Sequence, residues 1–131
     1  MDQLSDNKFV IHQMPGSLAV ARLDPKADVP TWSGTGSLCA VVRTPDELTV
    51  VCDQTVVPEH VITEGGWVAL AVEGPLSFSM VGVLVSLLEP LAANKIPVFV
   101  LSTFDTDYIL VKAERAEVAK QVLRSNGHHV E

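Results

Sequence analysis

The chain has 131 residues, 47% of them hydrophobic, and its sixteen Asp and Glu against nine Lys and Arg give a net charge of -7. This is enough apolar material for one compact domain or two small subdomains without metals or disulfides. The negative charge repels phosphate backbones and the basic residues are scattered, which argues against a nucleic-acid partner. The longest uncharged apolar stretch, within residues 75–88, is too short and too interrupted by serines to cross a bilayer, so we expect no membrane segment.

The N-terminal segment, residues 1–6, has neither the positive charge nor the apolar core of a signal peptide. We therefore expect a cytoplasmic protein, in which thiols stay reduced.

The first half of the chain reads as strands with poor helices. Strands are predicted at residues 8–12, 17–22, 37–43 and 48–53, with a Pro15-Gly16 turn after the first of them. The segments 24–36 and 56–64 contain prolines and allow at most short helices. If residues 44–47 form the turn of a hairpin, Arg43 faces Leu48.

In that register Cys39 faces Cys52, and a cross-strand disulfide is geometrically possible. Two reduced thiols that pack as small apolar side chains fit the expected compartment better.

The second half alternates strands with longer helices. The sequence predicts a strand at 66–73, a helix at 79–93 capped by Ser79, a hairpin of strands 96–103 and 108–113, a helix at 114–125 and a short strand at 128–131. Asn94 is predicted as the left-handed stop of the first helix. The residues predicted on the buried faces are Met80, Leu84, Leu87, Leu88 and Leu91 in the first helix and Ala116, Val118, Ala119, Val122 and Leu123 in the second. This β-α-β-β-α-β order is typical of a ferredoxin-like α+β fold, and the first half repeats it loosely. We predict two units, residues 1–62 and 63–131, that share a mostly antiparallel sheet.

Three segments of the second half resemble ACT domains when their order and spacing are taken together. They are VEGPLSFSMVGVL at 72–84, AANKIPV at 92–98 and STFDTDY at 102–108. More specifically, the chain resembles small tandem-ACT proteins, which are similar to aspartate kinase regulatory domains and to the cytosolic arginine sensors of animal cells. The first half matches only by its strand pattern and by residues 15–23.

The resemblance implies a regulatory module, usually dimeric, that binds an amino acid where ACT units meet. Gly82 corresponds to the glycine at the start of the family's first helix, and Ser102, Thr103, Phe104 and Asp107 to its strand-end motif. The loop before Gly82 departs from the Asp-x-x-Pro-Gly pattern common in the family, so the identity of the ligand does not transfer.

A free amino acid needs hydrogen-bond donors for its carboxylate, acceptors for its ammonium and a wall for its side chain. The predicted helix start at 79–82 offers unpaired N–H groups, and Asp107 could accept a bond from an ammonium or a guanidinium group. Phe104 could supply an apolar or cation–π wall, and Thr103 a hydroxyl. We therefore predict a ligand site, for an amino acid that could be cationic, formed by these residues: Ser77, Phe78, Ser79, Met80, Gly82, Ser102, Thr103, Phe104 and Asp107.

Each of these residues also has a purely structural interpretation. Asp105 and Asp107 suit a turn, Phe104 a core, and Ser79 a helix cap. The family spacing favours a ligand role for Thr103, Phe104 and Asp107, and leaves Asp105 as a turn residue.

Enzyme functions are poorly supported. The four histidines are dispersed or terminal, no Ser or Cys is tied to a base, and no phosphate-loop pattern occurs. Metal ligation is also weak because the cysteines lie in strands and form no Cys-x-x-Cys pair.

We therefore expect a non-enzymatic, homodimeric sensor without cofactor, catalytic residues or metal, whose amino acid ligand is held at an ACT–ACT or dimer interface. The alternative is a protein–protein interaction module with a vestigial pocket, because apolar residues occupy both faces of the 37–53 hairpin.

Overall fold

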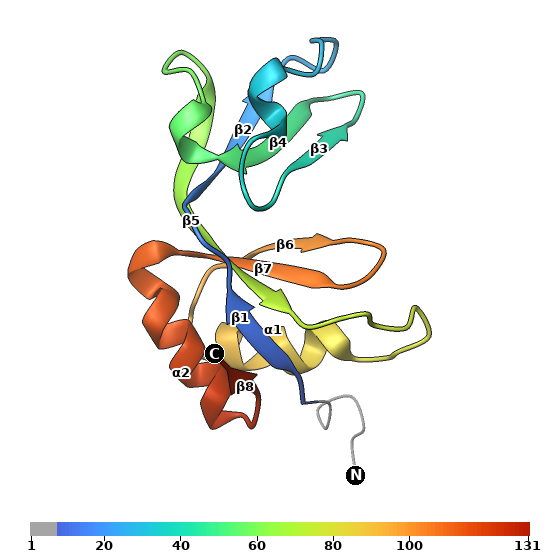
Figure 1. The fold of residues 1–131 in the computed structure, drawn as a ribbon, viewed down its shortest axis with the longest axis vertical. Helices are drawn as coiled ribbons and strands as arrows, with labels where there is room; N and C mark the ends of the chain where they lie inside the picture. The colour runs from blue at the N-terminus through green and yellow to red at the C-terminus, as the bar shows by residue number, and fades with distance from the viewer. Residues whose placement is uncertain (1–7) are drawn as a thin grey trace. The chain divides into compact units, whose positions relative to one another are not determined.

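The structure is a computed structural model that describes residues 8–131, so the N-terminal segment that lacks signal-peptide features lies outside the described residues. The elements follow in this order (Figure 1): β1 (Val10–Gln13), β2 (Leu18–Leu23), the 3-10 helix η1 (Thr31–Gly34), β3 (Ala40–Arg43), β4 (Leu48–Asp53), η2 (Gln54–Val56), β5 (Ile62–Val72), α1 (Val83–Ala93), β6 (Phe99–Ser102), β7 (Asp107–Lys112), η3 (Ala113–Arg115), α2 (Ala116–Ser125) and β8 (His129–Val130). The predicted α+β ferredoxin-like class is confirmed.

The chain forms two compact units. One consists of residues 15–68, and the other contains the described residues up to Met14 together with residues 69–131. Strand β5 belongs to both, because its first part pairs with β2 and its last residues pair with β1. The sequence predicts β1 in a first unit that ends at residue 62, and this division stays a prediction. In the structure, β1 lies in the same compact unit as the second half of the chain.

The unit of residues 15–68 is built of strands and 3-10 turns. Strand β4 pairs with both β2 and β3, and β2 also pairs with β5, all antiparallel. Arg43 pairs with Leu48, which confirms the register predicted from the 44–47 turn. Its buried cluster comes from β2 and β4: Ala21, Leu48, Val50 and Cys52.

The other unit has a helical layer. Strand β5 pairs with β1 and β7, β7 pairs with β6, and β1 pairs with β8 in parallel. Helices α1 and α2 pack against each other beside these strands (Figure 1). Leu87 and Leu91 of α1 and Leu123 of α2 are fully buried, because their three- and four-residue spacing puts them on one face of each helix.

Helix α1 begins at Val83, four residues after the predicted start, so the prediction that Ser79 caps it is wrong. Gly82 has a φ of 81°, in the left-handed region, and this backbone turn separates residues 79–81 from the helix. The Ser79 N–H instead donates to Ser77 Oγ, at 3.2 Å. Met80, predicted to be buried on the helix, consequently lies exposed in the preceding loop.

Two smaller predictions about the helices are also wrong. The left-handed residue after α1 is Lys95, with a φ of 58°, because Asn94 is still the C-cap. Val118 is 47% exposed, since two residues from Ala116 is a rotation of about 200° around α2, toward the opposite face.

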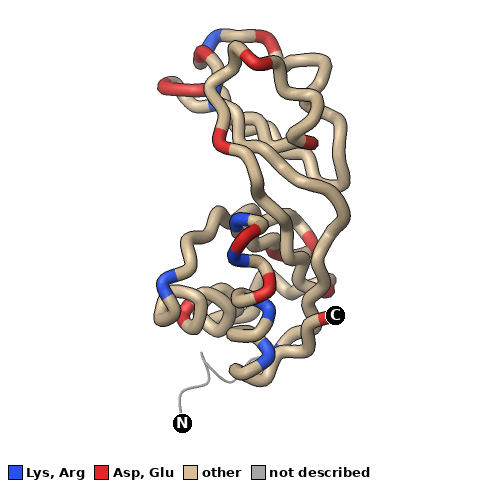
Figure 2. Tube along the Cα trace, turned by 90° about the vertical axis from the view of Figure 1, so that its left-hand side faces the viewer, with Lys and Arg blue, Asp and Glu red and all other residues tan. Residues whose placement is uncertain are grey.

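In residues 15–68, seven Asp and Glu residues are balanced by only three basic ones, Arg22, Lys26 and Arg43. Figure 2 shows the basic positions dispersed among acidic ones along the trace. Within residues 8–131, no helix is both long enough and apolar enough to cross a membrane.

Candidate functional site

A cavity of about 380 Å³ lies between the loop that leads into α1 and the turn that joins β6 to β7. Most of the predicted site residues line it: Ser77, Phe78, Met80, Gly82, Ser102, Thr103, Phe104 and Asp107. Ser79 does not line it; its hydroxyl lies 2.7 Å from the Ser77 hydroxyl, with which it shares a hydrogen bond. The structure thus brings together two segments that are about twenty residues apart in the chain.

The first wall of the cavity is the N-terminus of α1. The Ser86 N–H donates to the Gly82 carbonyl at 3.0 Å, which closes the first turn. The N–H groups at the start of a helix have no partner within the helix and carry the positive end of its dipole. Within the part of the chain that the structure describes, no side chain caps α1 and no acidic residue lies in its first turn. This wall is therefore suited to a negatively charged group.

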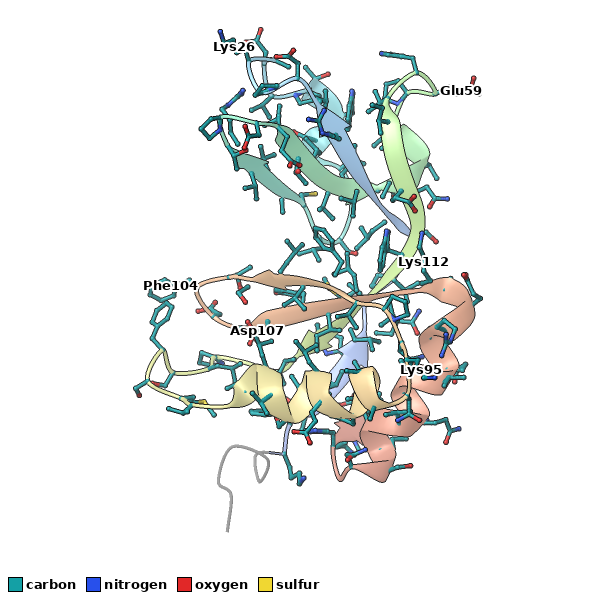
Figure 3. All side chains as sticks on the ribbon, turned by 180° about the vertical axis from the view of Figure 1, so that it is seen from behind. Lys26, Glu59, Lys95, Phe104, Asp107 and Lys112 are labelled. Carbon is teal, nitrogen blue, oxygen red and sulfur yellow. The ribbon has the colours of Figure 1, made fainter. Side chains whose placement is uncertain are left out.

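The second wall is the turn between β6 and β7. Ser102 pairs with Asp107 across the hairpin, and its hydroxyl donates to Asp107 Oδ1. The Thr103 N–H closes the turn by donating to the Thr106 carbonyl at 2.8 Å. These bonds hold the Asp107 carboxylate beside the β6–β7 turn. Figure 3 shows Phe104 and Asp107 at this end of the hairpin.

The same turn is anchored to the end of β5. The buried Thr106 hydroxyl donates to the Val72 carbonyl at 2.6 Å, and the Leu76 N–H donates to the Asp105 carbonyl at 2.6 Å. A Cβ atom at Gly74 would lie only 2.9 Å from that Asp105 carbonyl oxygen, so a glycine lets the two segments approach. The two walls therefore keep a defined spacing.

An aromatic pair bridges the two walls. The Phe78 and Phe104 ring centroids lie 4.9 Å apart in a T-shaped arrangement with an interplanar angle of 86°. The two residues nevertheless remain 75% and 80% exposed. Two large apolar rings that contact each other but not the core are typical of a surface that a ligand or another molecule covers.

The charged side chains that line the cavity are all acidic among the described residues. Asp105 and Asp107 are its only charged lining residues among those that the structure describes. A positively charged group in the cavity would gain charge-assisted hydrogen bonds from a carboxylate, while the helix N-terminus remains available to an anionic group.

Sequence reasoning missed several lining residues: Leu76, Val83, Leu84, Val85, Asp105 and Thr106. The sequence pattern places Leu84 on the buried face of a longer helix, gives no role to the other apolar residues and leaves Asp105 as a turn residue. Thr106 could have been noticed, because it is one of the polar residues of the 103–107 turn, but its burial depends on the contact with Val72.

No group of three or more His, Cys, Asp or Glu side chains is arranged to hold a metal ion among residues 8–131. His128, which is buried, makes structural bonds: its Nδ1 accepts from the Phe9 N–H at 3.1 Å, and its Nε2 lies 3.1 Å from the Ser86 carbonyl oxygen. Burial lowers the pKa of His128, the bond to Ser86 raises it, and the charge of Lys8 lowers it further.

Comparison with known proteins is consistent with these features. A family model described as "ACT domain" matches residues 62–125, and a model described as an N-terminal domain matches residues 16–60. None of the curated proteins compared is significantly similar to the chain.

Solved structures extend the match over nearly the whole chain. Protein Atu0741 from Agobacterium tumefaciens is 33% identical, with a TM-score of 0.90 over 95% of this chain and 93% of its own. A Vibrio cholerae protein of unknown function, VC0802, described as a possible transport protein, is 19% identical, with a TM-score of 0.76 over 94% of this chain and 93% of its own.

The regulatory subunit of aspartate kinase from Thermus thermophilus, in its ligand-free form, shares the fold at 12% identity, with a TM-score of 0.59 over 89% of this chain and 96% of its own. The fold and the family match agree with the resemblance found in the sequence. The chain therefore belongs to the ACT-domain proteins.

Proposed function

We propose that this protein is a non-enzymatic regulatory sensor that binds a free amino acid in the cavity between α1 and the β6–β7 turn. ACT domains are regulatory modules, which supports the general role. The observation that carries the proposal is the opposition of an uncapped helix N-terminus to a carboxylate across one cavity, since Gly82 and Asp107 both line it. An amino acid carries the two complementary charges on one small molecule.

The ligand carboxylate would bind at the first N–H groups of α1. The ligand ammonium, or a cationic side chain, would bind Asp107, whose carboxylate already accepts a bond from Ser102. A charge-assisted hydrogen bond of this kind is roughly twice as strong as a neutral one. The rings of Phe78 and Phe104 would cover the aliphatic part of the ligand.

We further propose that the protein acts as a homodimer in which a second copy, or a second ACT unit, covers the open side of the cavity. The exposed rings of Phe78 and Phe104 support this, because leaving both in water is unfavourable. A ligand with different affinities for two dimer arrangements would shift their populations and so pass its presence to a partner.

The first test is the melting temperature of the purified protein with each proteinogenic amino acid at millimolar concentration. A ligand that binds only the folded state at a hundredfold excess over Kd stabilises it by about 2.7 kcal/mol. We expect one amino acid, or a small group of similar ones, to raise the melting temperature.

The matched variants are Asp107→Asn and Glu73→Gln. Each removes one carboxylate from the same unit, but Glu73 is exposed and does not line the cavity. We expect Asp107→Asn to weaken binding at least tenfold by titration calorimetry, about 1.4 kcal/mol, and Glu73→Gln to leave it unchanged. Equal affinities for both variants would remove Asp107 from the site.

The proposed homodimer is tested by light scattering, which measures the molar mass of the protein in solution with and without ligand.

The second candidate is an interaction module whose cavity binds no metabolite. The exposed Phe78–Phe104 pair supports this function as much as it supports the sensor, because an exposed apolar patch is also typical of a surface that binds another protein. The amino acid screen separates the two functions: a folded dimer that no amino acid stabilises would support the interaction module and contradict the sensor.

A further inference from the structure

The two cysteines lie in the unit of residues 15–68, neither of them lines the cavity, and both are free thiols. Cys52 belongs to β4 and is buried, whereas Cys39 directly precedes β3 and is exposed. The proposed amino acid site uses neither residue, so their arrangement raises a separate question.

The register of the hairpin determines how the two thiols face each other. Ala40 pairs with Val51, so one further step along the antiparallel ladder puts Cys39 opposite Cys52. The Thr44 N–H donates to the Glu47 carbonyl at 2.9 Å, which makes that pair a hydrogen-bonded one. Hydrogen-bonded and non-hydrogen-bonded pairs alternate along the ladder, so the Cys39 and Cys52 position is non-hydrogen-bonded, with Cα atoms about 4.5 Å apart.

The backbone around Cys39 can adjust. The Asp53 N–H donates to the Thr35 carbonyl at 2.8 Å, so β4 leaves the β3 ladder after Cys52. Cys39 is thus held by the ladder on one side only, and its thiol makes a long contact of 3.7 Å with the Gly36 carbonyl. On the other side of β4, the neighbour of Cys52 is Ala19, which is small.

We propose that Cys39 and Cys52 form a reversible cross-strand disulfide that fastens the edge strand β3 to β4. The oxidant is a low-molecular-weight disulfide such as oxidised glutathione. The exposed Cys39 thiolate attacks one sulfur of the oxidant, which leaves a mixed disulfide and releases one thiol. The Cys52 thiolate then attacks Cys39 Sγ and releases the second thiol. Two protein thiols are oxidised and one oxidant disulfide is reduced to two thiols.

The environments of the two thiols suit this order of events. Burial, the neighbouring Cys39 and the charge of Asp53 all raise the pKa of Cys52, so Cys52 is a poor first nucleophile. Cys39 is exposed and can meet the oxidant in solution. Once Cys39 carries the mixed disulfide, Cys52 is the thiol that faces it across the hairpin.

The test treats the reduced full chain with excess oxidised glutathione, blocks remaining thiols with N-ethylmaleimide and digests with trypsin without reductant. Cleavage after Arg43 separates the two cysteines, so a disulfide links peptide 27–43 to peptide 44–95. We expect this linked peptide as the main product, in a protein that stays monomeric in mass on a non-reducing gel. We also expect a higher melting temperature that excess dithiothreitol reverses.

The matched control is the double variant Cys39→Ser with Ala40→Cys, which keeps two thiols but moves one to the neighbouring position on the opposite face of β3. It should give no linked peptide within one chain. The proposal is overturned if the natural chain gives only a glutathione adduct on Cys39, only disulfides between two chains, or the same yield of linked peptide as the double variant.

Discussion

Residues 15–68 and the unit that holds both α-helices follow the same alternation of strands and connections, but they differ in what the connections are. In residues 15–68 the connections contain Pro25, Pro30 and Pro58 and form only the 3-10 turns η1 and η2. In the other unit they form α1 and α2, of eleven and ten residues. A 3-10 turn has no extended row of aligned peptide dipoles.

This difference bears on where the proposed site lies. The N–H groups at the start of an α-helix suit an anionic group, and in the described part of the chain α1 presents them beside the β6–β7 turn. Residues 15–68 instead use their apolar side chains to close a small core around Leu48 and Val50. The comparison teaches that a repeated strand order does not repeat a helix N-terminus when the connecting segments form only 3-10 turns.

The largest expected effect compares one core residue from each unit. Leu91 in α1 and Leu48 in β4 are both fully buried, so Leu91→Ala and Leu48→Ala should each lower the free energy of unfolding by about 2–5 kcal/mol. Urea unfolding measures this change, and Val118→Ala on the exposed face of α2 should change it by less than about 0.5 kcal/mol.

The two units can be followed separately in the same experiment. Both tryptophans, Trp32 and Trp67, lie in residues 15–68, whereas both α-helices lie in the other unit. We expect the tryptophan fluorescence and the helical circular dichroism to change at one urea concentration in both variants, because β5 hydrogen-bonds in both units. Two separate midpoints would show that the units unfold independently.

A smaller effect is expected at the anchor of the β6–β7 turn. Thr106→Val removes the buried hydroxyl and its hydrogen bond to the Val72 carbonyl, at a cost of about 1–3 kcal/mol. The control is Thr63→Val in the other unit, where an exposed hydroxyl donates to the Val61 carbonyl and water can replace it. Equal losses in the two variants would contradict an anchoring role for Thr106.

The helical unit should also respond to pH through His128. Its pKa is lowered in the folded state, mainly by burial, so the unfolded chain binds a proton more readily. The contribution of His128 is therefore fully present above the unfolded pKa of about 6.5 and is lost as the pH falls below it. His128→Gln should reduce this loss of stability between neutral and acidic pH, whereas His60→Gln, at an exposed position in the other unit, should retain it.

A small effect on stability, close to that of the exposed control variants, is expected for Phe104→Ala. Its ring is mostly exposed and contacts Phe78 edge-on in a T-shaped arrangement, so the loss should be about 0.5 kcal/mol. A loss comparable with that of Leu91→Ala would place Phe104 in the core. If an amino acid ligand is found, the same variant should weaken its binding much more than it weakens the fold.

Much of this molecule follows from local sequence patterns. The alternation of apolar residues in strands and their three- and four-residue spacing in helices predict the element order, because burial of one face requires those periods. The short turn at 44–47 sets the pairing of Arg43 with Leu48, since a hairpin turn leaves little choice of register. The residues of the two cavity walls were indicated instead by the resemblance of segments 72–84 and 102–108 to ACT domains.

Other features became clear only in the folded structure. Ser79 has the right chemistry for a helix cap, but the left-handed turn at Gly82 places the start of α1 at Val83. Thr106 reads as an exposed turn residue until its hydroxyl meets the Val72 carbonyl. Strand β1 joins the helical unit because it pairs with the last residues of β5 and with β8, partners that its own sequence does not indicate. Local patterns thus determined the elements, whereas the left-handed turn at Gly82 set the start of α1 and hydrogen bonds between distant segments placed Thr106 and β1.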